Sequence, residues 1–132
     1  MTSNHSSYKS KGGFGRLFKA LRYSAQGLAA AFRHEAAFRQ ELLLVVVLIP
    51  VALWIGRSIG EMLLLIGALF FILIVELLNS ALEALADTIT LEHHPMIGRA
   101  KDLGSAAVML SLLFCALVWL AIIGAHILGP KI

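Results

Sequence analysis

Residues 62–87 read MLLLIGALFFILIVELLNSALEALAD, and this stretch joins a membrane-spanning pattern to a row of acids. No charge occurs from Met62 to Val75. Three carboxylates and one amide then follow within twelve residues: Glu76, Asn79, Glu83 and Asp87. A long uncharged apolar run predicts a transmembrane helix. Ionisable side chains inside such a helix are costly and usually functional, so the stretch indicates both the fold and the site.

Helical geometry places the three acids in one column. At 100° per residue, Glu83 and Asp87 each lie about 20° from Glu76 around the helix, and the column is about 16 Å long. Asn79 flanks it one turn on from Glu76. The alternative is that Glu76 and Glu83 only join helices through hydrogen bonds. That reading suits a lone intramembrane acid better than a column, which requires protons or cations to compensate it.

The composition also favours a lipid environment. Of 132 residues 59% are hydrophobic and 14% are charged, against about 25% charged in soluble domains. The net charge of +3 is not taken as a sign of nucleic-acid binding. In a chain this apolar, the distribution of the charges along the sequence matters more than their sum. The single cysteine, Cys115, lies in an apolar run and predicts a buried structural thiol. No cleavable signal peptide is expected, because the first 35 residues contain no apolar h-region.

The chain divides into a polar tail, an amphipathic helix and three apolar segments. We expect residues 1–13 to form a flexible tail and residues 14–34 to form an amphipathic helix on a membrane surface. A soluble core helix at 14–34 is disfavoured because the rest of the chain is membrane-like. Residues 35–128 predict a three-span bundle, with spans at about 36–56, 62–85 and 103–128. The predicted fold class is thus an all-α membrane protein.

Lysine and arginine predict the orientation. Seven precede the first span and two, Arg99 and Lys101, lie between the second and third. Only Arg57 lies between the first and second spans, and only Lys131 follows the third. The positive-inside rule therefore puts the N-terminus and the 86–102 loop in the cytoplasm and the C-terminus outside. His126 is expected at the outer interface.

Further polar groups gather on the predicted cytoplasmic side. The acids are Glu35, Glu41, Glu92 and Asp102, and the cations are Arg39, Arg99 and Lys101. Several carboxylates at an interface suggest Mg²⁺, which proteins usually hold with one or two carboxylates plus substrate phosphates. Glu41 fits an interface cap equally well. His93 and His94 are read as polar loop residues rather than metal ligands. GRAKDLGS, residues 98–105, is not a Walker A loop, although a lysine near a helix start can hold an anion.

Three sequence blocks resemble the prokaryotic diacylglycerol kinases. They are EAAFRQE (35–41), VELLNSALEALAD (75–87) and GRAKDLGSAAV (98–108), in the family's order and spacing. The resemblance covers roughly residues 14–127. It implies a small integral membrane kinase that transfers the γ-phosphoryl group of MgATP to diacylglycerol. It also implies that three copies of the chain form a homotrimeric helical bundle with sites between subunits. The expected location is the bacterial inner membrane.

The resemblance assigns roles to individual residues. Glu76 matches the general base that takes the proton from the lipid hydroxyl, and Asn79 matches a polar residue near the catalytic centre. Glu35 and Glu83 match the metal-binding acids. The positions matching the ATP site are Arg16, Tyr23, Glu35, Glu83, Glu92, His93, His94, Lys101 and Asp102. The positions matching the lipid-substrate site are Ser24, Arg39, Gln40, Glu41, Glu76 and Ser105. For Asp87 we expect a structural partner at the cytoplasmic end.

Departures and alternatives leave the lipid acceptor open. The family often has Trp at position 25, Asn at 34 and Arg at 88, where this chain has Ala25, His34 and Thr88. A related undecaprenol kinase would use the same polar groups, although Ser80 and GSAAV favour diacylglycerol. A non-enzymatic membrane protein is the remaining alternative. It leaves the surface helix and the Lys101–Asp102 pair without a purpose.

Overall fold

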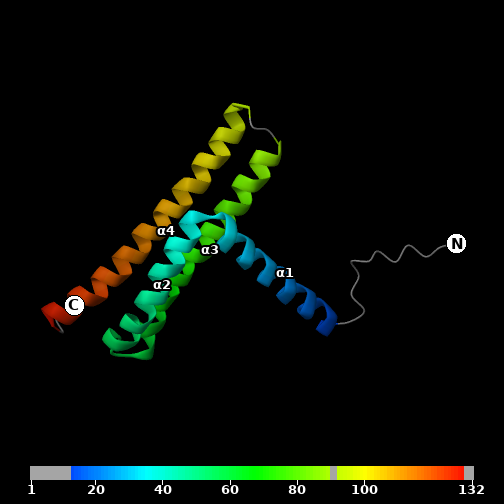
Figure 1. The fold of residues 1–132 in the computed structure, drawn as a ribbon. Helices are drawn as coiled ribbons and strands as arrows, with labels where there is room; N and C mark the ends of the chain where they lie inside the picture. Colours follow the sequence, from blue (N-terminus) through cyan, green and yellow to red (C-terminus); the bar gives the residue numbers. More distant parts are fainter. Residues whose placement is uncertain (1–12, 90–91, 130–132) are drawn as a thin grey trace. The chain divides into compact units, whose positions relative to one another are not determined.

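The chain folds into four helices in a computed structural model that describes residues 13–89 and 92–129 (Figure 1). The helices are α1 (Gly13–His34), α2 (Ala36–Ile55), α3 (Ile59–Ile89) and α4 (Pro95–Leu128). The predicted all-α membrane fold is confirmed, because three of these helices are long and apolar enough to cross a membrane. Residues 1–12 of the expected tail lie outside the described residues, and Gly13 already belongs to α1.

Among the described residues, helix α1 forms a unit of its own. Its large apolar side chains are all exposed: Phe14, Leu17, Phe18, Leu21, Leu28 and Phe32. Most of them are spaced three, four or seven residues apart between lysine and arginine side chains, as in a helix that rests on a lipid surface. The amphipathic pattern of the sequence is therefore present in a formed helix.

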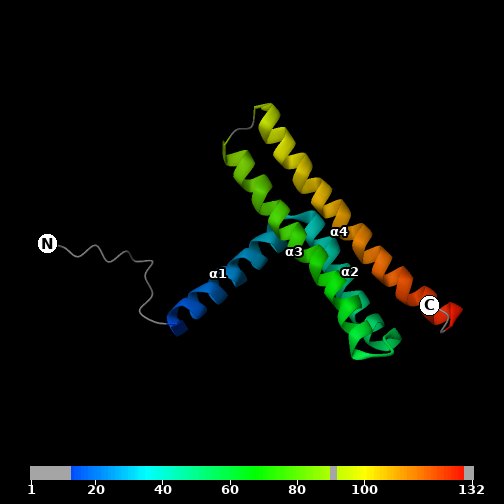
Figure 2. The same ribbon diagram turned by 180° about the vertical axis from the view of Figure 1, so that it is seen from behind.

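Helices α2 to α4 form the second unit, with α3 in contact with both neighbours (Figures 1 and 2). Their contact faces follow simple spacings. Every seventh residue of α2 is buried, at Phe38, Val45 and Ala52, and every fourth residue of α4 is buried, at Ser111, Cys115 and Trp119. Between them α3 buries Leu65, Ala68, Leu69, Ile72 and Leu73. Spacings of four and seven keep one side of a helix against its neighbour, so the core runs along α3.

Polar groups inside the bundle are accommodated locally. The indole Nε1 of Trp119 donates to the carbonyl oxygen of Leu65 at 3.2 Å, which ties α4 to α3 in the core. Pro50 lies within α2 without ending it. Membrane helices tolerate such a proline because neighbouring groups satisfy the freed carbonyl.

Helices α3 and α4 extend further than the spans expected from hydropathy. The expected spans end at residue 85 and begin at residue 103, whereas α3 continues to Ile89 and α4 begins at Pro95. Proline suits the first turn of a helix, and His94 Nδ1 accepts a hydrogen bond from the Met96 amide at 3.2 Å as its cap. Helix α3 has 31 residues and α4 has 34, against 20 in α2. At 1.5 Å per residue, α3 is about 46 Å long, α4 about 51 Å and α2 about 30 Å. The expected 86–102 loop is therefore mostly helical.

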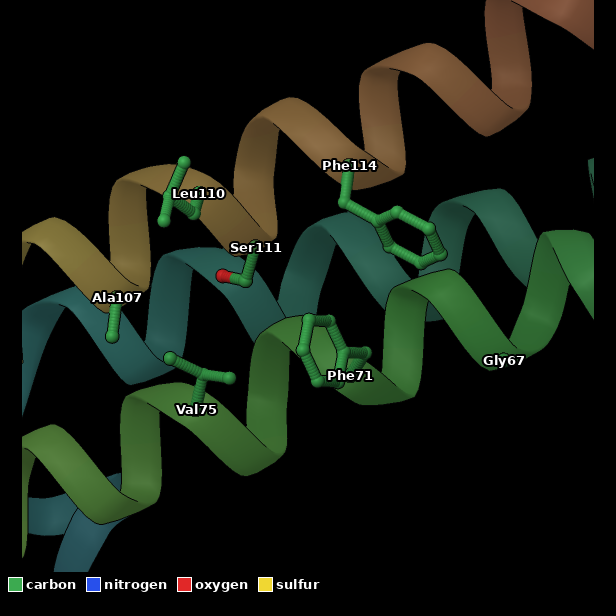
Figure 3. A pocket seen from close by; sticks show the side chains of 7 residues that line it. All are labelled: Gly67, Phe71, Val75, Ala107, Leu110, Ser111 and Phe114. Carbon is green, nitrogen blue, oxygen red and sulfur yellow. The ribbon is translucent and has the colours of Figure 1, made fainter.

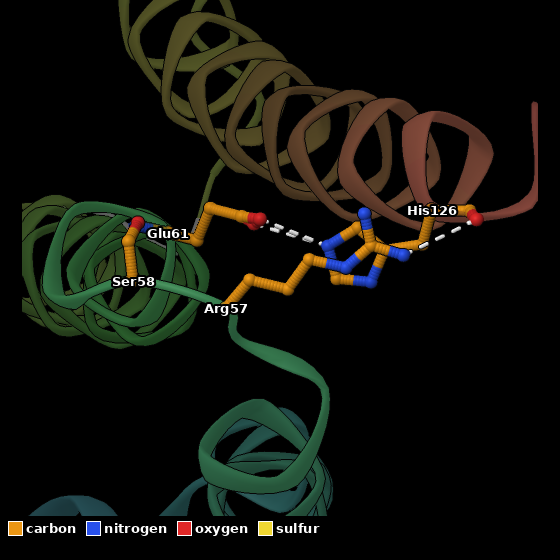
Figure 4. Close-up of polar contacts among 4 residues, drawn as sticks. All are labelled: Arg57, Ser58, Glu61 and His126. Atoms are coloured by element: carbon orange, nitrogen blue, oxygen red, sulfur yellow. Dashed lines mark hydrogen bonds and ion pairs between the residues drawn. The ribbon is translucent and has the colours of Figure 1, made fainter. Parts of the chain in front are cut away.

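The opposite end of the bundle is closed by a small polar cluster (Figure 4). His126 Nε2 lies 2.8 and 3.0 Å from the two carboxylate oxygens of Glu61. Arg57 donates to the His126 carbonyl at 3.3 Å, and the Glu61 amide donates to Ser58 Oγ at 3.1 Å. These contacts join the α2–α3 turn and the start of α3 to the end of α4.

Candidate functional site

Glu76 is a buried acid of α3 whose charge interacts with those of three further carboxylates, Glu35, Glu41 and Glu83. It is 4% exposed, and among the described Asp, Glu, Lys and Arg residues it alone is buried. Glu41, from α2, repels it electrostatically, and Glu35 and Glu83 act on it in the same sense. One carboxylate oxygen of Glu41 is itself buried without a hydrogen-bond partner. Like charges that interact at low dielectric favour the uptake of a proton or a cation.

The column predicted from helical geometry is present and graded by depth. Along α3, Glu76 is buried, Glu83 is partly exposed and Asp87 is exposed. The three acids therefore run from the interior of the bundle to its surface. The acid column therefore has a desolvated carboxylate at its inner end and more exposed carboxylates at its outer end.

Asn79 links this column to α4. Its Nδ2 donates to Glu83 Oε1 at 3.5 Å, the limit of a hydrogen bond, and its Oδ1 is buried without a partner. That oxygen lies where a Cβ of residue 104 would stand, so an alanine at 104 would require the Asn79 side chain to shift. Gly104 was not among the predicted site residues. A glycine within a helix costs about 1 kcal/mol relative to alanine, and that cost is the signal that could have identified it.

A polar pocket of about 320 Å³ lies where α3 ends and α4 begins. Its lining residues are Asp87, Glu92, His93, His94, Ile97, Gly98 and Lys101. Lys101 Nζ donates to Asp87 Oδ1 at 2.6 Å across the mouth of the α3–α4 hairpin. The structure thus brings four predicted ATP-site residues together. It adds Asp87, Ile97 and Gly98, of which Asp87 could have been assigned from its place on the acid column.

An apolar groove of about 640 Å³ lies further along the same two helices (Figure 3). It is lined by Gly67, Phe71, Val75, Ala107, Leu110, Ser111 and Phe114. The rings of Phe71 and Phe114 meet edge to face at 5.7 Å. The only hydroxyl in this lining, on Ser111, already donates to the Val108 carbonyl at 2.7 Å. The groove therefore suits a hydrocarbon chain better than a charged ligand.

The remaining predicted residues either line neither pocket or belong to the other unit. Arg16, Tyr23 and Ser24 lie on α1, in the separate unit. Arg39 and Gln40 are exposed on the first turns of α2. Asp102 and Ser105 are exposed on α4 and do not line the polar pocket.

Comparison with known proteins identifies the family. A sequence profile of the prokaryotic diacylglycerol kinase family matches residues 22–123. A diacylglycerol kinase of Pseudomonas aeruginosa is 49% identical over 118 residues, which is 89% of this chain and 96% of that protein. One of Escherichia coli is 43% identical over 86% of this chain and 93% of its own length. One of Helicobacter pylori is 43% identical over 81% and 84%. The chain therefore belongs to the prokaryotic diacylglycerol kinase family.

Proposed function

We propose that the protein transfers the γ-phosphoryl group of ATP to the hydroxyl group of diacylglycerol, giving phosphatidic acid and ADP. The observation that carries this proposal is the buried carboxylate of Glu76 beside a membrane-spanning core, with a polar pocket that contains Lys101 on the same helix pair. A lipid alcohol reaches Glu76 from the bilayer, while ATP reaches Lys101 from water. Family membership and the names of the relatives support diacylglycerol as the acceptor.

Glu76 would act as the general base. As the lipid oxygen bonds to the γ-phosphorus, the hydroxyl proton passes to Glu76, and the bond to the oxygen bridging the β- and γ-phosphates breaks. Asn79, bonded to Glu83 and seated against Gly104, would keep the column in register for this transfer. Phosphoryl transfer depends mainly on positioning and charge neutralisation, so a few acids and one lysine suffice.

Mg²⁺ is implied by the family, and the donor set fits it. Among the described residues no three His, Cys, Asp or Glu side chains are arranged as a metal cage. Mg²⁺ is usually held by one or two carboxylates with substrate phosphates supplying further oxygens. Glu35 and Glu83 would hold the ion. Asn79, which is hydrogen-bonded to Glu83, has a buried side-chain oxygen without a hydrogen-bond partner, and this oxygen is a further candidate ligand. When bound with ATP, the ion would neutralise charge on the phosphates.

The nucleotide would lie in the polar pocket. Lys101 offers an ammonium group to the phosphates, and Glu92, His93 and His94 line the same space. Asp102, Arg16 and Tyr23 complete the ATP-site residues that we propose by similarity to the family. Ser24, Arg39, Gln40, Glu41 and Ser105 are the proposed lipid-side residues, together with Glu76.

We place the enzyme in the bacterial inner membrane as a homotrimer with sites shared between subunits. Three apolar helices support a multi-pass membrane protein. The excess of lysine and arginine before α2 and near the start of α4 supports a cytoplasmic N-terminus and polar pocket. His126 and Glu61 then face the outside.

The decisive experiment measures transfer of γ-³²P from MgATP in mixed micelles containing diacylglycerol, monoacylglycerol or undecaprenol. We expect diacylglycerol to be the best acceptor. Failure to label any of the three would refute the kinase assignment, and preferential labelling of undecaprenol would reassign the acceptor.

A matched pair of variants tests the base. Glu76→Gln should lower kcat at least about 100-fold, the lower range for general-base catalysis, without loss of the folded oligomer. Glu61→Gln removes a carboxylate from the other end of the same helix and should leave kcat near that of the parent protein. Equal activities of the two variants would eliminate Glu76 as the base.

A further inference from the structure

Asp87 is the one acid of the column to which the proposed chemistry gives no task. Its carboxylate accepts a hydrogen bond from Lys101 Nζ at 2.6 Å. The pair bridges the last turns of α3 and the second turn of α4, and both side chains line the polar pocket. Lys101 is also attracted by the charge of Glu83, one helical turn before Asp87. The ammonium group is thus attracted by two carboxylates of one helix.

Folding stability alone is a weak reason for this pair. The side chains are 42% and 51% exposed, and ion pairs exposed to this degree contribute little to stability. A lysine carries its charge on a flexible four-carbon stem and loses much side-chain entropy when it is immobilised. A carboxylate that holds the lysine beforehand removes that cost from ligand binding.

We propose that Asp87 is a positioning residue, which holds the Lys101 ammonium group at the polar pocket so that it meets the phosphates of ATP already oriented. The proposal rests on the proposed function, in which Lys101 contacts those phosphates. Asp87 itself bears a negative charge and is not expected to touch the nucleotide. Its contribution passes through Lys101, and this dependence separates it from a metal ligand or a purely structural group.

The test compares Asp87→Asn with the parent protein in the mixed-micelle assay, with ATP and diacylglycerol varied in turn. Loss of one immobilising contact is expected to raise KM for ATP roughly three- to tenfold. KM for diacylglycerol and the Mg²⁺ concentration for half-maximal activity should stay unchanged. Asp87→Glu, which restores the charge, should recover most of the ATP affinity. Thr88→Ala is the matched control, because the Thr88 hydroxyl donates to the Ala84 carbonyl of the same helix at 2.8 Å and Thr88 lies outside the pocket lining.

The second arm repeats Asp87→Asn in a Lys101→Met background. If Asp87 acts through Lys101, the substitution has no further effect on KM for ATP there. An equal effect in both backgrounds, a change in Mg²⁺ requirement, or an unchanged KM in Asp87→Asn would each overturn the inference. Failure of the proposed function is distinguishable, because Lys101→Met would then leave KM for ATP unchanged by itself.

Discussion

Replacement of Gly104 by alanine tests whether the contact between α3 and α4 sets the geometry of the site. A Cβ at residue 104 would collide with Asn79 Oδ1 and would stand 3.4 Å from Asn79 Cγ and 3.8 Å from Leu82 Cδ2. The amide oxygen must therefore retreat by about 1 Å to restore packing distances typical of a protein interior. The hydrogen bond from Asn79 to Glu83 is already 3.5 Å long, so this movement is expected to lengthen or break it.

The expected cost falls on catalysis more than on stability. A misplacement of about 1 Å at a catalytic site can lower the rate about 100-fold, so we expect a decrease in kcat of that order. Overpacking costs about 1–3 kcal/mol, and alanine regains up to about 1 kcal/mol of helix propensity over glycine. The net loss of folding free energy should therefore stay below about 2 kcal/mol.

The assay is steady-state phosphorylation of diacylglycerol in mixed micelles, together with unfolding in a detergent titration. Gly124→Ala, on the same helix, is the control, because a Cβ at residue 124 would meet nothing within 4 Å. It should retain kcat. A Gly104→Ala protein with parental kcat would refute the reasoning. So would a further loss of activity from Gly104→Ala in an Asn79→Ala background, since the effect must pass through Asn79.

Three further perturbations follow from the structure. Trp119→Phe removes the indole donor to the Leu65 carbonyl and should lower the unfolding free energy by about 1 kcal/mol, with kcat retained; an unchanged unfolding midpoint would contradict this. Glu61→Gln and His126→Ala break the same contact, so the double variant should be about as stable as the less stable single variant, and additive losses of Tm would argue against coupling. Removal of divalent cations with a chelator should abolish phosphorylation, and Mg²⁺ should restore it; full activity without divalent cations would exclude the proposed roles of Glu35 and Glu83.

Much of the fold could be predicted because lipid imposes simple rules on a chain. An uncharged run such as 62–75 must be helical in a bilayer, since every backbone group has to be satisfied within the helix. The same helical period placed Glu76, Glu83 and Asp87 in one column before any contact was known. Hydropathy was less informative about helix ends, because it detects the apolar part of a helix that lies in lipid. Residues 95–102 are helical but lie outside the apolar span, so hydropathy did not predict them as helix.

The site could be predicted only as far as local spacing reaches. The sequence by itself determined the membrane helices, the depth order of the acids along α3 and the family to which the chain belongs. Only the tertiary structure decided that Glu41 of α2 is near enough to Glu76 for their charges to interact, that Asn79 lies against Gly104, and that Lys101 pairs with Asp87. The physical reason is that helical periodicity relates residues of one helix, whereas contacts between helices depend on how each pair is rotated and shifted in packing. That relative placement depends on all the side chains in the interface and not on any single sequence block.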